Sequence, residues 1–129
     1  MSGTGSVALV RAFWEGFGPT CEHAVAVCRK VLDEGVSWES PFTEEAPVKS
    51  LDDLVAFLDR AREAGVERYR LEVKHAAAHE DVVLSQRVQT MMDKDGNVLD
   101  VLDVMAVTRV MDGKIVWNRD YFYGTRAQG

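Results

Sequence analysis

The segment Gly113-Lys-Ile-Val-Trp-Asn-Arg-Asp-Tyr-Phe-Tyr-Gly124 has the composition and alternation of a β-strand bounded by glycines. Successive side chains of a strand point to opposite faces, so one face carries Val116, Asn118, Asp120 and Phe122, and the other carries Ile115, Trp117, Arg119 and Tyr121. Asp120 is thereby predicted to lie among apolar neighbours. A carboxylate in such a place is costly unless a partner or a reaction requires it. Asp120 is therefore the first candidate for a functional residue.

The same period of two extends through the second half of the chain. It predicts strands at residues 67–79, 81–92, 98–111 and 114–124, with hairpin turns at 93–97 and 111–113. The first half follows the helical period instead, and predicts helices over residues 6–17, 20–33 and 51–64 and a short strand over residues 36–40. Gly18-Pro19 is expected to end the first helix, Thr20 to begin the second and Ser50 to cap the third.

This order of elements predicts an α+β fold in a single domain, residues 1–129. Three N-terminal helices pack in a strongly curved, mixed or antiparallel sheet that encloses one pocket. The chain has 129 residues, of which 47% are hydrophobic and 28% charged, which is ordinary for a globular domain. A net charge of −6 and the lack of a basic stripe argue against nucleic acid, and the apolar runs are too short to cross a membrane. A small hydrophobic substrate is the expected partner.

Cysteines and histidines offer little further chemistry. Cys21 and Cys28 lie two helical turns apart, about 10 Å, which is too far for a disulfide, so buried free thiols are expected. His75 and His79 share a strand face but lack a third ligand at suitable spacing, so neutral histidines are favoured over a zinc site. The polar start of the chain has no signal-peptide pattern, and residence in the cytoplasm is expected.

Three segments together resemble the limonene-1,2-epoxide hydrolase family: Val82-Val-Leu-Ser-Gln-Arg-Val88, Asp112-Gly-Lys-Ile115 and Arg119-Asp-Tyr-Phe122. That family belongs to a superfamily of cone-shaped folds, described as cystatin-like or nuclear-transport-factor-like, which includes SnoaL-like polyketide cyclases and ketosteroid isomerase. The resemblance covers residues 71–122 in sequence and nearly the whole chain in element order. It implies a pocket enzyme without metal or cofactor.

The resemblance also implies roles for individual residues. Asp120 stands at the position of the water-activating aspartate, and Arg87 at that of the arginine that orients it. Gln89 stands where the family has a general-acid aspartate, and a glutamine has no proton to give to an opening epoxide. Trp38 and Ser40 stand at the positions of the tyrosine and asparagine that hold the attacking water.

Each candidate has a structural alternative. Arg87 and Asp120 could be an ion pair that only satisfies itself, although desolvation makes such pairs poor sources of stability. Strand alternation places Asp100 on the inward side near the pocket mouth, where it could replace the missing acid, but an exposed residue beside a hairpin turn is the favoured interpretation. The remaining candidates either line a pocket for a bulky apolar substrate or simply fill the core: Trp14, Phe17, Trp38, Met91, Val104 and Phe122.

The opposite face of the sheet also collects apolar residues, namely Met105, Val107, Trp117 and Tyr121. Such a patch suggests either a homodimer through the outer sheet face or cover by a helix. For the pocket, the leading hypothesis is epoxide ring opening, by hydrolysis or cyclisation, with Asp120 as base. The alternatives are proton transfer next to a carbonyl, as in polyketide cyclases and ketosteroid isomerase, or a small-molecule binding protein without catalysis.

Overall fold

A computed structural model describes residues 3–125 and has the predicted order of elements. The elements are α1 (Gly3–Glu15), α2 (Cys21–Val31), β1 (Leu32–Glu39), the 3-10 helix η1 (Pro41–Thr43), α3 (Leu51–Glu63), β2 (Arg68–His79), β3 (Val82–Met92), β4 (Val98–Met111) and β5 (Lys114–Thr125). No helix within the described range combines the length and apolar character that a bilayer span requires.

Two helix starts follow from local side-chain chemistry, as predicted. The Thr20 side chain accepts a hydrogen bond from the backbone N–H of His23 at the start of α2, and Ser50 accepts one from Asp53 at the start of α3. Each bond satisfies a backbone donor that the first turn of a helix leaves free. The second helix ends earlier than expected because Leu32 is already extended and begins β1. The predicted strand 36–40 is therefore longer at its N-terminal end.

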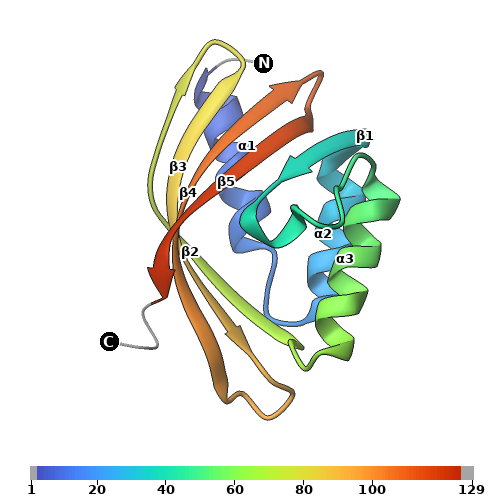
Figure 1. The fold of residues 1–129 in the computed structure, drawn as a ribbon. Helices are drawn as coiled ribbons and strands as arrows, with labels where there is room; N and C mark the ends of the chain where they lie inside the picture. The colour runs from blue at the N-terminus through green and yellow to red at the C-terminus, as the bar shows by residue number, and fades with distance from the viewer. Residues whose placement is uncertain (1–2, 126–129) are drawn as a thin grey trace.

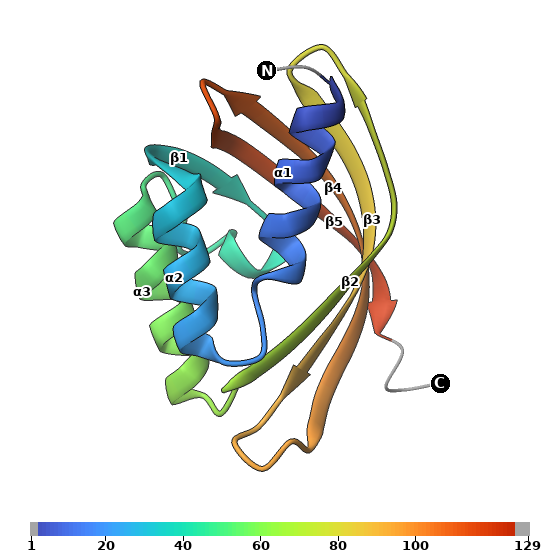
Figure 2. The same ribbon diagram turned by 180° about the vertical axis from the view of Figure 1, so that it is seen from behind.

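The five strands form one mixed sheet in the order β1-β5-β4-β3-β2. Strand β1 runs parallel to β5, and the other neighbours are antiparallel. The sheet is strongly curved, and all three helices lie on its concave side, with α2 and α3 next to each other (Figures 1 and 2). The α+β cone is thus confirmed, and its core lies between the helices and the concave face.

One strand position differs from the prediction. Ile115 was placed on the outer face with Trp117, but it is fully buried. The cause is an irregularity between β4 and β5: Arg109 pairs with Trp117, whereas the next residue, Val110, pairs with Ile115. The extra residue on β5 reverses the alternation at that point. From Asn118 onward the predicted inner and outer faces hold.

The convex face of the sheet has no helix over it in the described part of the chain (Figures 1 and 2). Helix cover is therefore the wrong explanation for its apolar residues. Met105 and Tyr121 are about half exposed, at 51% and 48%, and Leu84 on β3 is similar at 50%. Val107 and Trp117 are partly buried. An exposed apolar surface of this kind remains open to a partner.

Candidate functional site

Arg87 on β3 and Asp120 on β5 form an ion pair on the concave face of the sheet. The guanidinium donates from Nη1 to Oδ1 at 3.3 Å and from Nη2 to Oδ2 at 3.1 Å. The two side chains are only 2% and 5% exposed. Strand β4 lies between them, with Val104 paired to Arg87 and the small Ala106 paired to Asp120. The arginine side chain therefore reaches across β4, and the structure brings together the two residues that strand alternation placed inside.

Asn118 is a further member of this polar centre, to which the sequence analysis assigned only a face. Its Nδ2 donates to Asp120 Oδ1 at 3.0 Å, while its own Oδ1 accepts a hydrogen bond of 2.7 Å from the Thr108 hydroxyl. Both Asn118 and Thr108 are fully buried. Because the hydroxyl occupies the amide oxygen, the amide nitrogen faces Asp120. The two-residue spacing between Asn118 and Asp120 was the only available signal for this contact.

The carboxylate of Asp120 thus has a fixed orientation and one favoured reactive atom. Oδ1 accepts two hydrogen bonds, from Arg87 and Asn118, whereas Oδ2 accepts one, from Arg87. Each carboxylate oxygen has about two acceptor positions, so Oδ2 can still take a proton or a hydrogen bond from a water or a substrate. This arrangement suits a general base.

Gln89 is attached to the same guanidinium from the other side. Its Oε1 accepts from Arg87 Nε at 3.1 Å and from Nη2 at 3.0 Å. Arginine only donates, so these contacts fix the amide oxygen on Arg87 and leave Nε2 to face elsewhere. Nε2 contacts the sulfur of Met91 at 3.7 Å. Gln89 is thereby presented to the pocket as a hydrogen-bond donor.

Trp14 supports the arginine from α1. The guanidinium carbon lies 3.5 Å from the centre of the indole ring, a close cation–π contact. Burial lowers the pKa of Arg87, and the nearby negative charge of Asp120 opposes that effect. Arginine remains charged in proteins despite such shifts. The centre is therefore a fixed positive charge held between an indole, a carboxylate and an amide.

A cavity of about 450 Å³, here called the chamber, opens next to this centre. Its wall includes the polar side chains of Arg87, Gln89 and Asp120. It also includes seven of the eight residues predicted to bind substrate, namely Trp14, Phe17, Trp38, Ser40, Met91, Asp100 and Phe122. The exception is Val104, which is fully buried between Arg87 and Phe122 and does not reach the chamber. Strand alternation correctly placed Val104 on the concave side, but its side chain packs beneath the site.

Several wall residues were missed. They come from α3, the following turn, β2 and the start of β4: Leu54, Phe57, Leu58, Ala61, Ala64, Val66, Tyr69, Leu99 and the η1 residue Phe42. The apolar face of α3 was evident in the sequence, but the periodicity of a helix does not say which cavity its face meets. With these residues the chamber is a mainly apolar space that has its polar groups at a few points.

Asp100 is half-buried and lines the chamber, so the favoured interpretation of an exposed strand-end residue is wrong and the inward placement by strand alternation is correct. It pairs across β3 and β4 with Met91. One carboxylate oxygen accepts a hydrogen bond of 3.0 Å from the backbone N–H of Val101. Asp100 is therefore a chamber residue. It lies two residues before Leu102 on β4, and Leu102 is the residue that pairs with Gln89.

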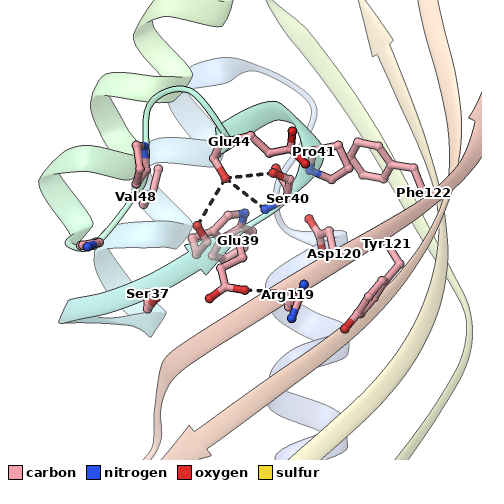
Figure 3. Close-up of a pocket in the computed structure, with 14 residues that line it drawn as sticks. Ser37, Glu39, Ser40, Pro41, Glu44, Val48, Arg119, Asp120, Tyr121 and Phe122 are labelled. Atoms are coloured by element: carbon pink, nitrogen blue, oxygen red, sulfur yellow. Dashed lines mark hydrogen bonds and ion pairs between the residues drawn. The ribbon is translucent and has the colours of Figure 1, made fainter.

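A second cavity of about 530 Å³, here called the outer pocket, lies where β1 separates from β5 (Figure 3). It shares Trp38, Ser40, Asp120 and Phe122 with the chamber, so the two spaces adjoin. Ionic residues line its outer part, including the pair between Arg119 and Glu39 at 3.4 Å. The outer pocket reaches neither Arg87 nor Gln89, and the chamber is the better place for a hydrophobic substrate.

Ser40 is held by its own local structure. Its side chain accepts a hydrogen bond from the backbone N–H of Phe42, and its backbone N–H donates to Thr43 Oγ1, which together cap η1. The serine hydroxyl therefore has a structural task at the junction of the two cavities, while its proton remains available to an acceptor.

The other titratable candidates lie apart from the chamber. Cys21 and Cys28 are buried free thiols, as predicted. His75 and His79 are exposed on β2. Within residues 3–125, no cluster of three or more histidine, cysteine, aspartate or glutamate side chains is placed to hold a metal ion.

Comparison with protein families identifies one match: the model of the SnoaL-like domain matches residues 8–118. No curated protein matches the sequence. Among solved structures, an LEH-like epoxide hydrolase of M. tuberculosis superposes with a TM-score of 0.74 and 20% identity, over 94% of this chain and 80% of that one.

Two other similar structures carry different assignments. A SnoaL-like protein from Jannaschia sp. CCS1, proposed to be a polyketide cyclase, has a TM-score of 0.71 and 20% identity, over 93% of this chain and 86% of its own. A proposed ketosteroid isomerase from Kribbella flavida has a TM-score of 0.71 and 19% identity, over 95% and 80%. At such identities the likeness shows a shared fold, on which several chemistries occur.

Proposed function

We propose that this chain, which belongs to the SnoaL-like domain family, is an enzyme that opens an epoxide ring in a hydrophobic substrate with Asp120 as the base. The observation that carries the proposal is the carboxylate itself: it is buried, oriented by Arg87 and Asn118, and placed at the wall of an apolar chamber with Oδ2 free to accept a proton. Strongly desolvated, hydrogen-bonded carboxylates in clefts are typical of catalytic sites.

In the proposed reaction, Oδ2 takes a proton from a water molecule or from a hydroxyl of the substrate. The oxygen so activated forms a bond to an epoxide carbon while the bond from that carbon to the ring oxygen breaks. The ring oxygen becomes an alkoxide, which Gln89 Nε2 stabilises by donating a hydrogen bond. The alkoxide finally receives the proton held by Asp120, directly or through water, which restores the carboxylate. Arg87 orients both partners without transferring a proton.

One observation favours a second reaction, proton transfer next to a carbonyl. Gln89 offers a neutral N–H at the position where a family acid would stand, and an enolate oxygen needs only such a donor. Asp120 would then remove a proton from carbon and return it at another position. Asp100, also at the chamber, is the available carboxyl group if ring opening requires a true acid.

The deciding experiment incubates the wild type with terpene, styrene and polyketide-type epoxides in oxygen-18 water and analyses the products by mass spectrometry. Labelled diol made by the wild type but not by Asp120→Asn is the expected result. The control is Asp112→Asn, which neutralises an exposed carboxylate at a turn where φ is +52° and asparagine is well tolerated. Unlabelled isomers as products would mean that the enzyme cyclises or isomerises its substrate and does not add water. Saturable binding without any product would identify a binding protein.

We also propose that a second copy of the chain covers the convex face. Support comes from the half-exposed side chains of Leu84, Met105 and Tyr121 on three adjacent strands. Sedimentation velocity should give a dimer for the wild type and a monomer for Met105→Glu, because a charge there would be buried without a partner. A monomeric wild type at micromolar concentration would exclude this interface. The proposed cellular compartment remains the cytoplasm.

A further inference from the structure

Tyr69 is a buried polar residue that the proposed reaction does not use. It lies on β2, points to the concave side and lines the chamber. Its ring packs edge-to-face against Phe17, with centroids 5.3 Å apart. Its backbone N–H donates to the Pro19 carbonyl at 2.9 Å. A side chain on Gly18 would approach the Tyr69 carbonyl oxygen to 2.1 Å, so the linker between α1 and α2 packs directly on this residue. The linker therefore fixes the backbone of Tyr69, and Phe17 packs against its phenol ring.

The hydroxyl of Tyr69 has no hydrogen-bond partner among residues 3–125, although the residue is only 4% exposed. The fully enclosed side-chain polar atoms without a partner in that range are Trp14 Nε1 and Ser85 Oγ, so the Tyr69 oxygen keeps some contact with open space. Tyrosine hydroxyls that are this deeply buried usually find a partner, because an unmade bond costs about 1–3 kcal/mol. Tyr69 lines two spaces, the chamber and a cavity of about 420 Å³ that is bordered by Gly18 and Pro19. Its side chain lies on the concave side of the sheet, where the chamber is, so the chamber is the space in which a ligand can meet the hydroxyl.

The place of Tyr69 relative to the polar centre follows from strand register. Tyr69 pairs with Met91, and Met91 is contacted by the amide nitrogen of Gln89. Gln89 is paired with Leu71, so Tyr69 is its diagonal neighbour across β2 and β3, about 8 Å away between α-carbons. Asp120 is reached from Gln89 through Arg87. A ligand whose reacting group meets Asp120 and Gln89 and which extends past Met91 therefore reaches Tyr69.

Two properties of this end of the chamber define what it can bind. Burial raises the pKa of Tyr69, so the phenol keeps its proton and is a hydrogen-bond donor at all ordinary pH values. Asp100 lies across Met91 from Tyr69 and lines the same space, and its carboxylate disfavours an anionic ligand group. A neutral oxygen, as in a carbonyl, ether or hydroxyl group, satisfies both conditions.

We propose that Tyr69 determines substrate specificity by donating a hydrogen bond to a neutral oxygen on the substrate, remote from the reacting group. The substrate class is a hydrophobic compound with oxygen functions at two ends, one at Asp120 and Gln89 and the other at Tyr69. The identity of the reacting end rests on the function proposed above. The contact at Tyr69 rests on the geometry of the chamber alone.

The test compares two ligands of nearly equal shape, 6-methoxy-2-naphthol and 6-ethyl-2-naphthol, by calorimetric titration of the wild type and Tyr69→Phe. Only the methoxy oxygen can accept from the tyrosine. The measured quantity is the ratio of the dissociation constants of the ethyl and methoxy compounds. This ratio should be at least about fivefold larger in the wild type than in Tyr69→Phe, which is the effect of one neutral hydrogen bond. An equal preference in both proteins would overturn the proposal.

A stability measurement separates this role from a structural one. The thermal midpoint of Tyr69→Phe should equal or exceed that of the wild type, because the substitution removes a hydroxyl that has no partner and keeps the ring. A clear decrease would mean that the hydroxyl stabilises the fold, and would also overturn the proposal. Failure of the wild type to bind either naphthol would refute the chamber as a ligand site and the proposed function with it. The binding assay does not depend on turnover. If Tyr69→Phe loses the preference for the methoxy compound but the wild type opens no epoxide, only the proposed reaction is overturned and the role of Tyr69 stands.

Discussion

Replacing both members of the Arg87–Asp120 pair should destabilise the protein less than replacing either one. Arg87→Met leaves the carboxylate of Asp120 with the single donor Asn118, in a site where the side chain is 5% exposed. Asp120→Asn leaves the guanidinium without a counter-charge, at 2% exposure. An uncompensated buried charge typically lowers the free energy of unfolding by about 3–5 kcal/mol.

The double variant Arg87→Met/Asp120→Asn contains neither charge. The carbonyl of the new asparagine can still accept the hydrogen bond from Asn118 Nδ2, and the methionine keeps much of the packing against Trp14. We therefore expect the double variant to lose no more than about 3 kcal/mol, where simple addition of the single effects predicts at least about 6 kcal/mol. The coupling free energy is then at least about 3 kcal/mol.

Urea unfolding followed by far-ultraviolet circular dichroism measures all four proteins. Each single variant should also lower the thermal midpoint by about 12–20 °C, since about 4 °C corresponds to 1 kcal/mol for a chain of this length. The double variant should be inactive but more stable than either single variant, which is the behaviour of a pair retained for chemistry. Strictly additive effects would refute the reasoning, because they would mean that neither charge depends on the other.

Three further predictions concern the fold. Gly18→Ala should lower the free energy of unfolding by more than about 2 kcal/mol, since its β-carbon would meet the Tyr69 carbonyl oxygen at 2.1 Å. The control Gly35→Ala should be nearly neutral, because its β-carbon meets only a side-chain oxygen at 3.4 Å, and equal effects of the two substitutions in urea unfolding would contradict the predicted contact. Burial raises the pKa of Cys28 to about 12 from the ordinary value of 9.0, so the folded protein keeps a proton that the unfolded chain releases. The free energy of unfolding should therefore be unaffected by this thiol below about pH 8.5, and should decline between about pH 9 and 12 by up to about 1.4 kcal/mol per pH unit. Cys28→Ala should make that decline shallower, and an unchanged slope from pH 8 to 10.5 would count against burial as the cause. Ser50→Ala should cost about 1 kcal/mol through the lost cap of α3, and Ser50→Asp, which can cap equally, should not.

Much of the fold was predictable because its signals are local. The period of two located β2 to β5 to within a residue or two, and the caps Thr20 and Ser50 marked where α2 and α3 begin. The inner position of Asp120 followed from alternation alone. Ile115 was misplaced because the irregularity beside Val110 depends on how two strands pair, and no single strand contains that information.

The candidate site was predictable only in part for a related reason. Alternation indicates which side a residue faces, so Arg87 and Asp120 were placed correctly inside. It does not indicate depth: Val104 faces inward but lies beneath the chamber wall. The place of Tyr69 at the cavity depends on the packing of β2 against elements far apart in the chain, and the orientation of the Asn118 amide depends on Thr108 on the neighbouring strand.

The hydrogen-bonded centre of the chamber and part of its apolar wall come from different layers of the molecule. Every side chain in the hydrogen-bonded centre, from Thr108 through Asn118, Asp120 and Arg87 to Gln89, belongs to a strand of the sheet. Four residues of the facing apolar wall belong to α3, which makes none of those hydrogen bonds: Leu54, Phe57, Leu58 and Ala61. Side chains of α3 can therefore be exchanged to admit substrates of another shape while the reactive groups keep their geometry. Such separation makes the domain a suitable starting scaffold for engineering, in which helix libraries are screened against a constant chemical centre.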